Sequence, residues 1–162
     1  MLTVLKILTL FLTMLTLAPG LAHLFELPTK IGLPRDAYFI VQGIYAGWAW
    51  FGVVILAAIA ANLILAFWLR RHNRRAALFA VCSAALIAVS LAVFFTWTFP
   101  ANQATLNWTT IPDDWERLRA AWEYSHAANA LINTVAFLVT AAAVIAPLPS
   151  TTSLPDPGRS AP

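Results

Sequence analysis

The sequence predicts an all-α integral membrane protein, built as an antiparallel bundle of four transmembrane helices. Of its 162 residues, 60% are hydrophobic and 10% are charged, whereas charged residues make up about 25% of a typical soluble domain. The apolar residues form long stretches, and about 20 such residues are enough for a helix to cross a bilayer. We expect these stretches to form one domain, residues 1–146, followed by a disordered Pro-rich tail at residues 147–162.

The first predicted span covers residues 2–22, which are apolar except for Lys6 and four threonines. The segment also has features of a signal peptide, because Lys6 precedes an apolar run and a small-residue site. Against cleavage, small and polar side chains recur on one face of the helix: Thr9, Thr13, Thr16, Gly20 and His23. Such stripes let transmembrane helices pack closely, so we interpret the segment as a retained helix.

The other predicted spans are residues 44–69, 76–99 and 121–146. Between the first two spans, Pro28, Gly32 and Pro34 are expected to break any long helix. Pro100 is expected to stop the third span, because proline cannot continue a helical hydrogen-bond ladder. The fourth helix is expected to begin near Pro112, ahead of its membrane part.

Four of the ten basic residues lie in one short loop, as Arg70, Arg71, Arg74 and Arg75. Cytoplasmic loops are enriched in Lys and Arg, so this loop predicts a cytoplasmic location. With four spans, both termini are then cytoplasmic and both polar connections lie outside, as expected in a bacterial inner (plasma) membrane. The basic residues mark topology and indicate no nucleic-acid partner. The predicted partner is the lipid bilayer, and the oligomeric state stays open.

The last helix carries one polar and aromatic stripe at alternating spacings of four and three: Trp115, Arg119, Trp122, His126, Asn129 and Asn133. At about 100° per residue these side chains share one face, with Glu123 at its margin. A helix that is apolar elsewhere turns such a stripe into a bundle or cavity. Counting about 20 residues for a span places both His126 and His23 at the outer boundary of the membrane. This stripe is therefore the candidate working face.

Two histidine–glutamate pairs, His23 with Glu26 and Glu123 with His126, are expected at one depth on two helices. Residues three positions apart share a helix face, and Glu-x-x-His pairs occur in di-metal bundle proteins. The sequence leaves open a mononuclear zinc or iron site with these four ligands. The cofactor identity is unknown on this evidence.

The alternative to a metal is that both carboxylates pair with Lys30 and Arg119, the latter lying four residues from Glu123. His126 is a candidate general base, because the ordinary pKa of histidine lies near neutrality. A structural role for His126 is equally compatible with the sequence.

Candidate ligand-binding residues near the same boundary are Asn102, Asn107, Trp108, Trp122 and Asn129. Amide side chains could orient a carbonyl or stabilise an oxyanion, and tryptophans could cover a flat aromatic or quinone-like ligand. The alternatives are hydrogen bonds between helices and an interfacial aromatic belt.

Five segments carry a further signal: residues 20–30, 38–48, 99–102, 107–108 and 119–126. They resemble an uncharacterised family of four-span bacterial membrane proteins that is related to the anthrone oxygenases of fungal polyketide pathways. Anthrone oxygenases insert oxygen into a fused aromatic ring, without a bound cofactor. The positions that match the family are Asn102, Asn107, Trp108, Arg119, Trp122 and His126.

Two functions follow as hypotheses. In the first, the protein oxidises or binds an aromatic, quinone-like molecule in a pocket on the outer side. His126 removes a proton from the ring, Arg119 stabilises the anion, and His23 joins the substrate-binding residues. In the second, the protein has no catalytic activity and binds a hydrophobic ligand or a partner subunit.

Overall fold

The computed structural model describes residues 1–147, and this range contains helices and turns with no β-strand. Four helical stretches are long and apolar enough to cross a membrane: Leu2–Lys30, Trp48–Leu69, Arg74–Ala104 and Trp115–Ile145. The predicted all-α membrane fold is therefore confirmed. The tail predicted at residues 147–162 lies, from residue 148 on, outside the described residues.

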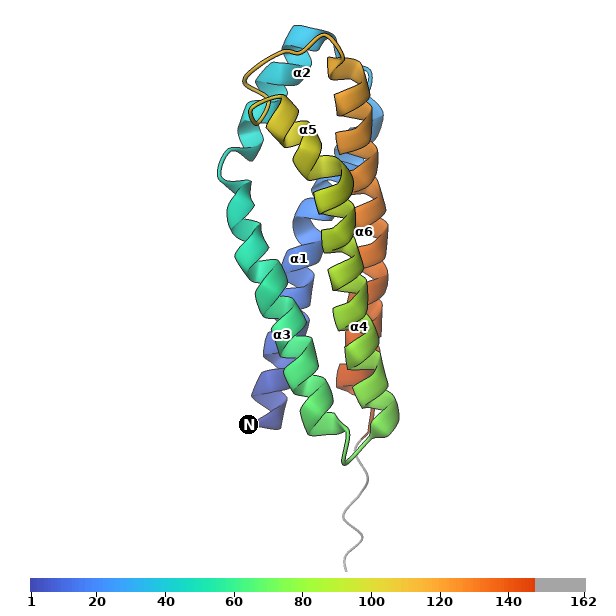
Figure 1. The fold of residues 1–162 in the computed structure, drawn as a ribbon. Helices are drawn as coiled ribbons and strands as arrows, with labels where there is room; N and C mark the ends of the chain where they lie inside the picture. The colour runs from blue at the N-terminus through green and yellow to red at the C-terminus, as the bar shows by residue number, and fades with distance from the viewer. Residues whose placement is uncertain (148–162) are drawn as a thin grey trace, which may run out of the picture.

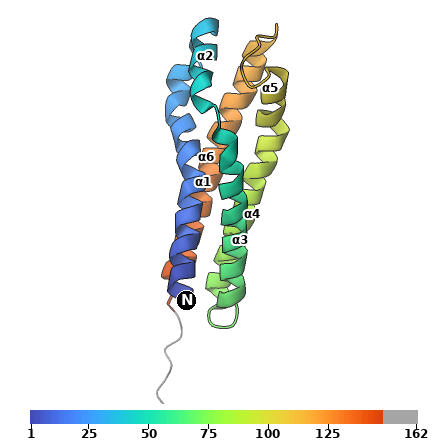
Figure 2. The same ribbon diagram turned by 90° about the vertical axis from the view of Figure 1, so that its left-hand side faces the viewer.

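The bundle is formed by α1 (Leu2–Lys30), α3 (Phe51–Leu69), α4 (Arg74–Val93) and α6 (Trp115–Ile145). Contacts join α1 to α3, α3 to α4, α4 to α6 and α6 back to α1. Figures 1 and 2 show these helices running along one common axis with alternating direction. Each helix is therefore antiparallel to both of its neighbours.

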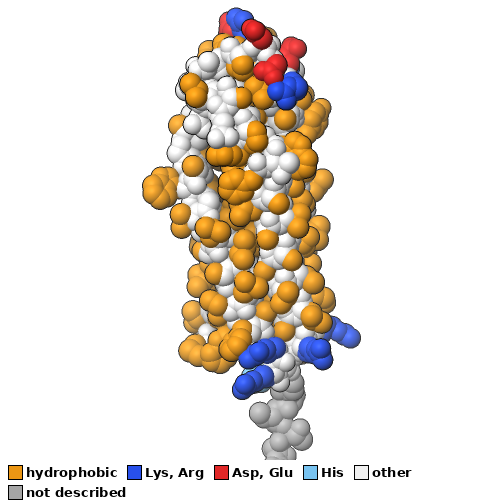
Figure 3. Space-filling view, in the orientation of Figure 1, with side chains coloured by type: hydrophobic (Ala, Val, Ile, Leu, Met, Phe, Trp, Pro, Cys, Tyr) orange, Lys and Arg blue, Asp and Glu red, His pale blue; other side chains and the backbone are white. Residues whose placement is uncertain are grey.

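The two ends of the bundle differ in composition. The N-terminus and the turn between α3 and α4 lie at one end, which we call the arginine end because it carries Arg70–Arg75. The opposite end, which we call the α2 end, holds α2 (Arg35–Gln42), α5 (Phe99–Ala104) and residues 105–114. Figure 3 shows basic side chains alone at the arginine end, mixed charges at the α2 end, and an apolar surface between them. This distribution is typical of a multi-pass membrane protein.

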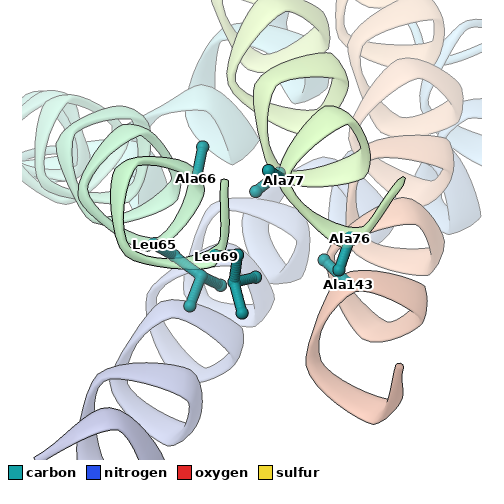
Figure 4. Close-up of a cluster of buried hydrophobic side chains, with 7 residues drawn as sticks. Leu65, Ala66, Leu69, Ala76, Ala77 and Ala143 are labelled. Atoms are coloured by element: carbon teal, nitrogen blue, oxygen red, sulfur yellow. The ribbon is translucent and has the colours of Figure 1, made fainter. Parts of the chain in front are cut away.

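Small residues allow the helices to approach closely. A Cβ atom built on Gly20 would lie 3.2 Å from Cα of Ala130, so α1 and α6 meet there more closely than a side chain ordinarily allows. The predicted stripe on α1 is inward, since Thr9, Thr13 and Thr16 are buried with Gly20. Toward the arginine end, Figure 4 shows Leu65, Ala66 and Leu69 of α3 packed near alanines of α4 and α6.

A buried polar network in the middle of the bundle was not predicted from the sequence. The amide of Asn62 on α3 donates to Oγ1 of Thr13 on α1 at 3.1 Å. Oδ1 of Asn62 accepts from Thr140 on α6 at 3.2 Å, and Thr140 lies 2.6 Å from Ser83 on α4. Four side chains thus link all four helices, and interhelical hydrogen bonds of this kind stabilise membrane bundles modestly.

The predicted break at Pro28 is wrong. Helix α1 continues through Pro19 and Pro28 to Lys30, because each proline removes only one backbone donor and the rest of the ladder holds the helix. The predicted start of the second span at residue 44 is also early. Residues Gly43–Tyr45 (η1) and Trp48–Trp50 (η2) are short 3-10 turns, and α3 begins at Phe51.

Pro100 does not stop the third span. The π-helical turn η3 (Phe94–Thr98) connects α4 to α5, in which Pro100 occupies the first turn. The N–H of Phe99 donates to the carbonyl of Phe94, five residues earlier. This wider turn lets the helix continue although Pro100 has no N–H to donate. The fourth helix begins at Trp115 rather than near Pro112, with Asp114 as its N-cap.

Candidate functional site

The site is centred on two imidazole rings at the α2 end. His23 on α1 and His126 on α6 lie with their ring centroids 4.1 Å apart. His23 is buried, with 4% of its surface exposed, and its Nδ1 has no hydrogen-bond partner. The prediction that both histidines reach one depth and face each other agrees with this geometry, and the catalytic role of His126 remains a prediction.

Three aromatic side chains surround His23. Its ring centroid lies 4.5 Å from that of Tyr45, 4.9 Å from that of Trp122 and 5.5 Å from that of Trp48. Trp122 also packs edge-on against His126 at 4.2 Å. Side chains therefore pack closely where the sequence predicted a pocket. Glu26, with 37% of its side chain exposed, lies at the more solvent-accessible edge of this aromatic cluster.

A buried lysine neutralises charge beside the imidazole pair. Nζ of Lys30 lies 3.1 Å from Oε1 of Glu123 and 3.6 Å from Oε2 of Glu26. It also donates to the hydroxyl of Tyr45 at 2.7 Å and stands 4.6 Å from the ring of Trp122. Cations are attracted to the faces of aromatic rings, so Lys30 is held by charge and by π-electron density together.

Two tyrosines extend this network, and both lie outside the membrane-spanning segments. The Tyr38 hydroxyl donates to Glu123 at 2.9 Å and accepts from the amide of Gln42. The Tyr45 hydroxyl donates to Glu26. Burial, followed by the neighbouring carboxylate, raises the pKa of each tyrosine above its ordinary value. Both phenols therefore keep their protons at neutral pH and act as hydrogen-bond donors.

Local backbone structure explains why these side chains meet. Because α1 continues past Pro28, it carries Lys30 to the level of Glu123 near the start of α6. Gly47 has φ +84, a left-handed conformation that side chains rarely adopt. This turn separates η1 from η2 and brings Tyr45 and Trp48 to the same side, with their ring centroids 5.0 Å apart.

Arg119 lies apart from the imidazole pair. Its guanidinium stands 4.6 Å from the ring of Trp115 and 5.5 Å from that of Tyr38, and it donates to the carbonyl of Leu33 at 2.9 Å. The predicted pairing of Arg119 with Glu123 is wrong, because Glu123 contacts Lys30 and Tyr38 instead. The predicted pairing of Glu26 with Lys30 is present at 3.6 Å.

The candidate residues Asn102, Trp108 and Trp122 contact one another. Oδ1 of Asn102 accepts from the indole N–H of Trp108 at 3.0 Å and from that of Trp122 at 2.9 Å. Leu106, Asn107 and Trp108 all have positive φ, and this turn places Trp108 inside while Asn107 is exposed. Asn107 therefore stands outside the cluster.

Asn129 and Asn133 continue the stripe toward the middle of the bundle, and both are buried. Asn133 accepts from Ser90 on α4 at 3.3 Å, which is the structural role that the sequence also allowed. Oδ1 of Asn129 is buried without a hydrogen-bond partner. Asn129 thus leaves one acceptor free one helical turn below His126.

The metal alternative gains no support from this geometry. Within residues 1–147, no three His, Cys, Asp or Glu side chains are placed to hold one metal ion. The ammonium of Lys30 lies between Glu26 and Glu123, so it supplies the positive charge that a metal would otherwise bring. We therefore treat Glu26 and Glu123 as parts of a hydrogen-bonded cluster, with His23 and His126 packed beside it through their rings.

An open groove adjoins the cluster at the start of α3. It has a volume of about 390 Å³ and is lined by Ala46, Gly47, Trp48, Trp50, Phe51 and Val54. Trp48 belongs to both features, because its ring also contacts His23 and Tyr45.

Reasoning from the sequence missed Tyr38, Gln42, Tyr45 and Trp48 as members of this cluster. All four lie in the segment interpreted as a connection and a span entry. The hydroxyls of Tyr38 and Tyr45 bond Glu123 and Glu26, and the ring of Trp48 contacts His23, all of them distant in the chain. Tyr38 and Gln42 are four residues apart and both are buried, which is a helical spacing that could have identified them.

Comparisons of the chain with protein-family models, with curated proteins and with solved structures found no match.

Proposed function

We propose that this protein is a bacterial inner-membrane enzyme, similar to anthrone oxygenases, that oxidises an electron-rich aromatic molecule at the α2 end. The observation that supports the proposal is the pair of imidazole rings 4.1 Å apart, with Trp122 packed against both rings and Tyr45 and Trp48 packed against His23. Histidine is the commonest general base, and aromatic side chains suit a flat ligand. Ionisable side chains at membrane depth are costly, and those that are present commonly serve a function.

The proposed reaction needs the substrate and dioxygen. His126 accepts a proton from a ring CH₂ that is conjugated with a carbonyl, which leaves a delocalised carbanion. The carbanion adds dioxygen through a new C–O bond, and the returning proton gives a hydroperoxide. Loss of water then leaves a second ring carbonyl, so CH₂ and O₂ become C=O and H₂O.

The charged residues near the histidine pair suggest Lys30, in place of Arg119, as the cation that stabilises the substrate anion. The sequence suggested Arg119, but its guanidinium is engaged with Trp115, Tyr38 and Leu33. Lys30 is the cation beside the rings that pack on His23, and it contacts both Tyr45 and Trp122. In the proposed reaction Lys30 therefore stabilises the anion, through its charge and through the Tyr45 hydroxyl.

Oxygen uptake tests the proposal. Membranes that contain the protein are offered anthrone or a hydroquinone, and oxygen consumption is followed for the wild type and for His126→Ala. The third histidine of the chain, His72, is exposed in the turn between α3 and α4, so His72→Ala is the matched control. We expect His126→Ala to lose at least tenfold in rate and His72→Ala to keep it. Equal rates in all three would exclude the enzymatic function.

The second candidate is a non-catalytic protein that binds a hydrophobic ligand. It is favoured by the apolar lining of the groove beside Trp48, Trp50 and Phe51. Binding of a quinone, measured by quenching of tryptophan fluorescence without any oxygen uptake, would favour this function over the first.

We also propose that the arginine end faces the cytoplasm and the α2 end faces outward. The support is four exposed arginines at this end: Arg70 and Arg71 in the turn between α3 and α4, and Arg74 and Arg75 in the first turn of α4. The histidine pair would then lie near the outer surface of the membrane.

A further inference from the structure

Two buried oxygen atoms on the side chains that bond Tyr38 have no hydrogen-bond donor. They are Oε2 of Glu123 and Oε1 of Gln42. Glu123 is 1% exposed and Gln42 is 4% exposed, so bulk water does not supply the missing donors. A buried polar atom without a partner costs about 1–3 kcal/mol, and two such atoms on neighbouring side chains call for a shared explanation.

The same two side chains are already joined through Tyr38. The amide of Gln42 donates to the Tyr38 hydroxyl at 2.5 Å, and that hydroxyl donates to Oε1 of Glu123 at 2.9 Å. Both hydrogen bonds run in one direction, from Gln42 to Glu123. This series of hydrogen bonds has Gln42 at one end and Glu123 at the other, and each of the two residues has one free acceptor. A donor on Oε2 of Glu123 that reached Oε1 of Gln42 would close the series into a ring.

The charged groups around Glu123 also favour a proton on this residue. The charged and titratable groups around Glu123 are Lys30 and Glu26 from α1, Tyr38 from α2 and Tyr45 from η1, and α6 itself carries Arg119 and His126 one turn to either side. Arg119 is held one turn away, by Leu33 and Trp115. Among the described residues, Lys30 is the one cation in direct contact with these carboxylates, and it is shared by Glu26 and Glu123, so a charge on both would be balanced only in part at the buried contact.

We propose that Glu123 holds a proton on Oε2 at neutral pH and donates it to Oε1 of Gln42. A proton needs no cavity, and it satisfies both free atoms at once. It closes the ring Gln42–Tyr38–Glu123 and leaves Lys30 to balance Glu26, whose carboxylate is the more exposed of the two. The cluster is thus a buried proton-binding site beside the histidine pair, an inference that does not rest on the proposed reaction.

Infrared spectroscopy of the purified full chain in lipid nanodiscs tests this. A protonated carboxyl group has a C=O stretch that an ionised carboxylate lacks. We expect this band in the wild type at neutral pH, its loss in Glu123→Gln and its retention in the matched variant Glu26→Gln. A wild-type spectrum without the band, or a band that persists in Glu123→Gln, overturns the proposal.

A second variant keeps the test decisive if Glu123→Gln does not fold. Gln42→Leu removes the proposed acceptor while Glu123 stays in place, so the C=O band should shift to higher frequency as its hydrogen bond is lost. An unchanged band in Gln42→Leu overturns the proposed ring. Where Glu123→Gln does fold, its thermal stability should match that of the wild type, because the new amide can donate to Gln42 as the acid does.

Discussion

The ammonium of Lys30 lies 3.1 Å from the carboxyl oxygen of Glu123, and both side chains are almost fully buried. The contact joins the last residue of α1 to the first turns of α6. Lys30 also bonds the Tyr45 hydroxyl, so the segment between α1 and α3 is fixed to the same point. The polar cluster therefore stabilises the packing of three elements at the α2 end.

Replacing Lys30 by methionine should destabilise the protein strongly. Methionine keeps most of the volume but removes the positive charge opposite Glu26 and three contacts at 2.7–3.6 Å. A hydrogen bond that involves a charged group contributes about 1.5–3 kcal/mol, and this variant loses those of Lys30 with the Tyr45 hydroxyl and with Glu123. Unfolding by denaturant in mixed micelles, followed by circular dichroism, should show an unfolding free energy that is lower than that of the wild type by this amount.

Arg35→Met is the matched control, because the ion pair of Arg35 with Asp36 is exposed on both sides. Such pairs contribute about 0–1 kcal/mol, so Arg35→Met should unfold close to the wild type. Equal midpoints for the two variants would contradict the view that Lys30 is a buried anchor.

Gly20→Leu should separate α1 from α6. The Cβ atom alone would lie 3.2 Å from Cα of Ala130, which is backbone and cannot move independently. Overpacking of this kind costs about 1–3 kcal/mol or more. Gly52→Leu is the control, because nothing lies within 4 Å of the Cβ position at Gly52. Thermal unfolding of the two variants should differ clearly, and similar melting temperatures would exclude tight packing at Gly20.

The fold was predictable because hydropathy alone determines which segments cross a bilayer. Segment length and the small-residue stripe of α1 were sufficient for the inward face of that helix. Helix ends were less predictable, since Pro28 and Pro100 are usual breakers. Whether such a proline ends a helix depends on whether the neighbouring turn can rearrange its hydrogen bonds around the missing N–H, which is a property of the tertiary structure.

The candidate site was predictable in part. Helical spacing placed His126, Trp122 and Asn129 on one face, and depth counting brought His23 to the same level. Spacing within one helix could not choose between Lys30 and Arg119 as the partner of Glu123. The choice depends on how far α1 extends past Pro28, and Arg119 is closer to Glu123 in sequence but points to Leu33.

Asn62→Leu should loosen the middle of the bundle. The change removes a donor to Thr13 and an acceptor for Thr140, while both threonines keep bonds to carbonyls of their own helices. Side-chain hydrogen bonds between membrane helices contribute about 0.6 kcal/mol each on average, so we expect a loss of about 1–2 kcal/mol. The lipid-facing neighbour Leu63→Ala should change the unfolding free energy less. A larger loss in Leu63→Ala would contradict this.

Asn102→Leu should leave two indole N–H groups without an acceptor. Trp108 and Trp122 share Oδ1 of Asn102, and both rings are buried. The cost should be about 2 kcal/mol or more, since each buried unpaired donor costs about 1–3 kcal/mol, and tryptophan emission should shift. Asn102→Asp keeps the acceptor and should restore both properties, while the exposed neighbour Gln103→Ala should have no effect. If Asn102→Asp does not restore the emission, Asn102 has a role other than accepting the two indole hydrogen bonds.

The orientation of the bundle can be measured with single cysteines. The native Cys82 is first replaced by alanine, since it is exposed on the surface of α4. Asp36→Cys then reports on the α2 end and Arg71→Cys on the arginine end, and both positions are exposed. A membrane-impermeant maleimide should label Asp36→Cys in intact cells, because arginine-rich loops stay on the cytoplasmic side. It should label Arg71→Cys only after the cells are opened, and detergent should make both react. Labelling of Arg71→Cys in intact cells would reverse the orientation and place the histidine pair at the cytoplasmic surface.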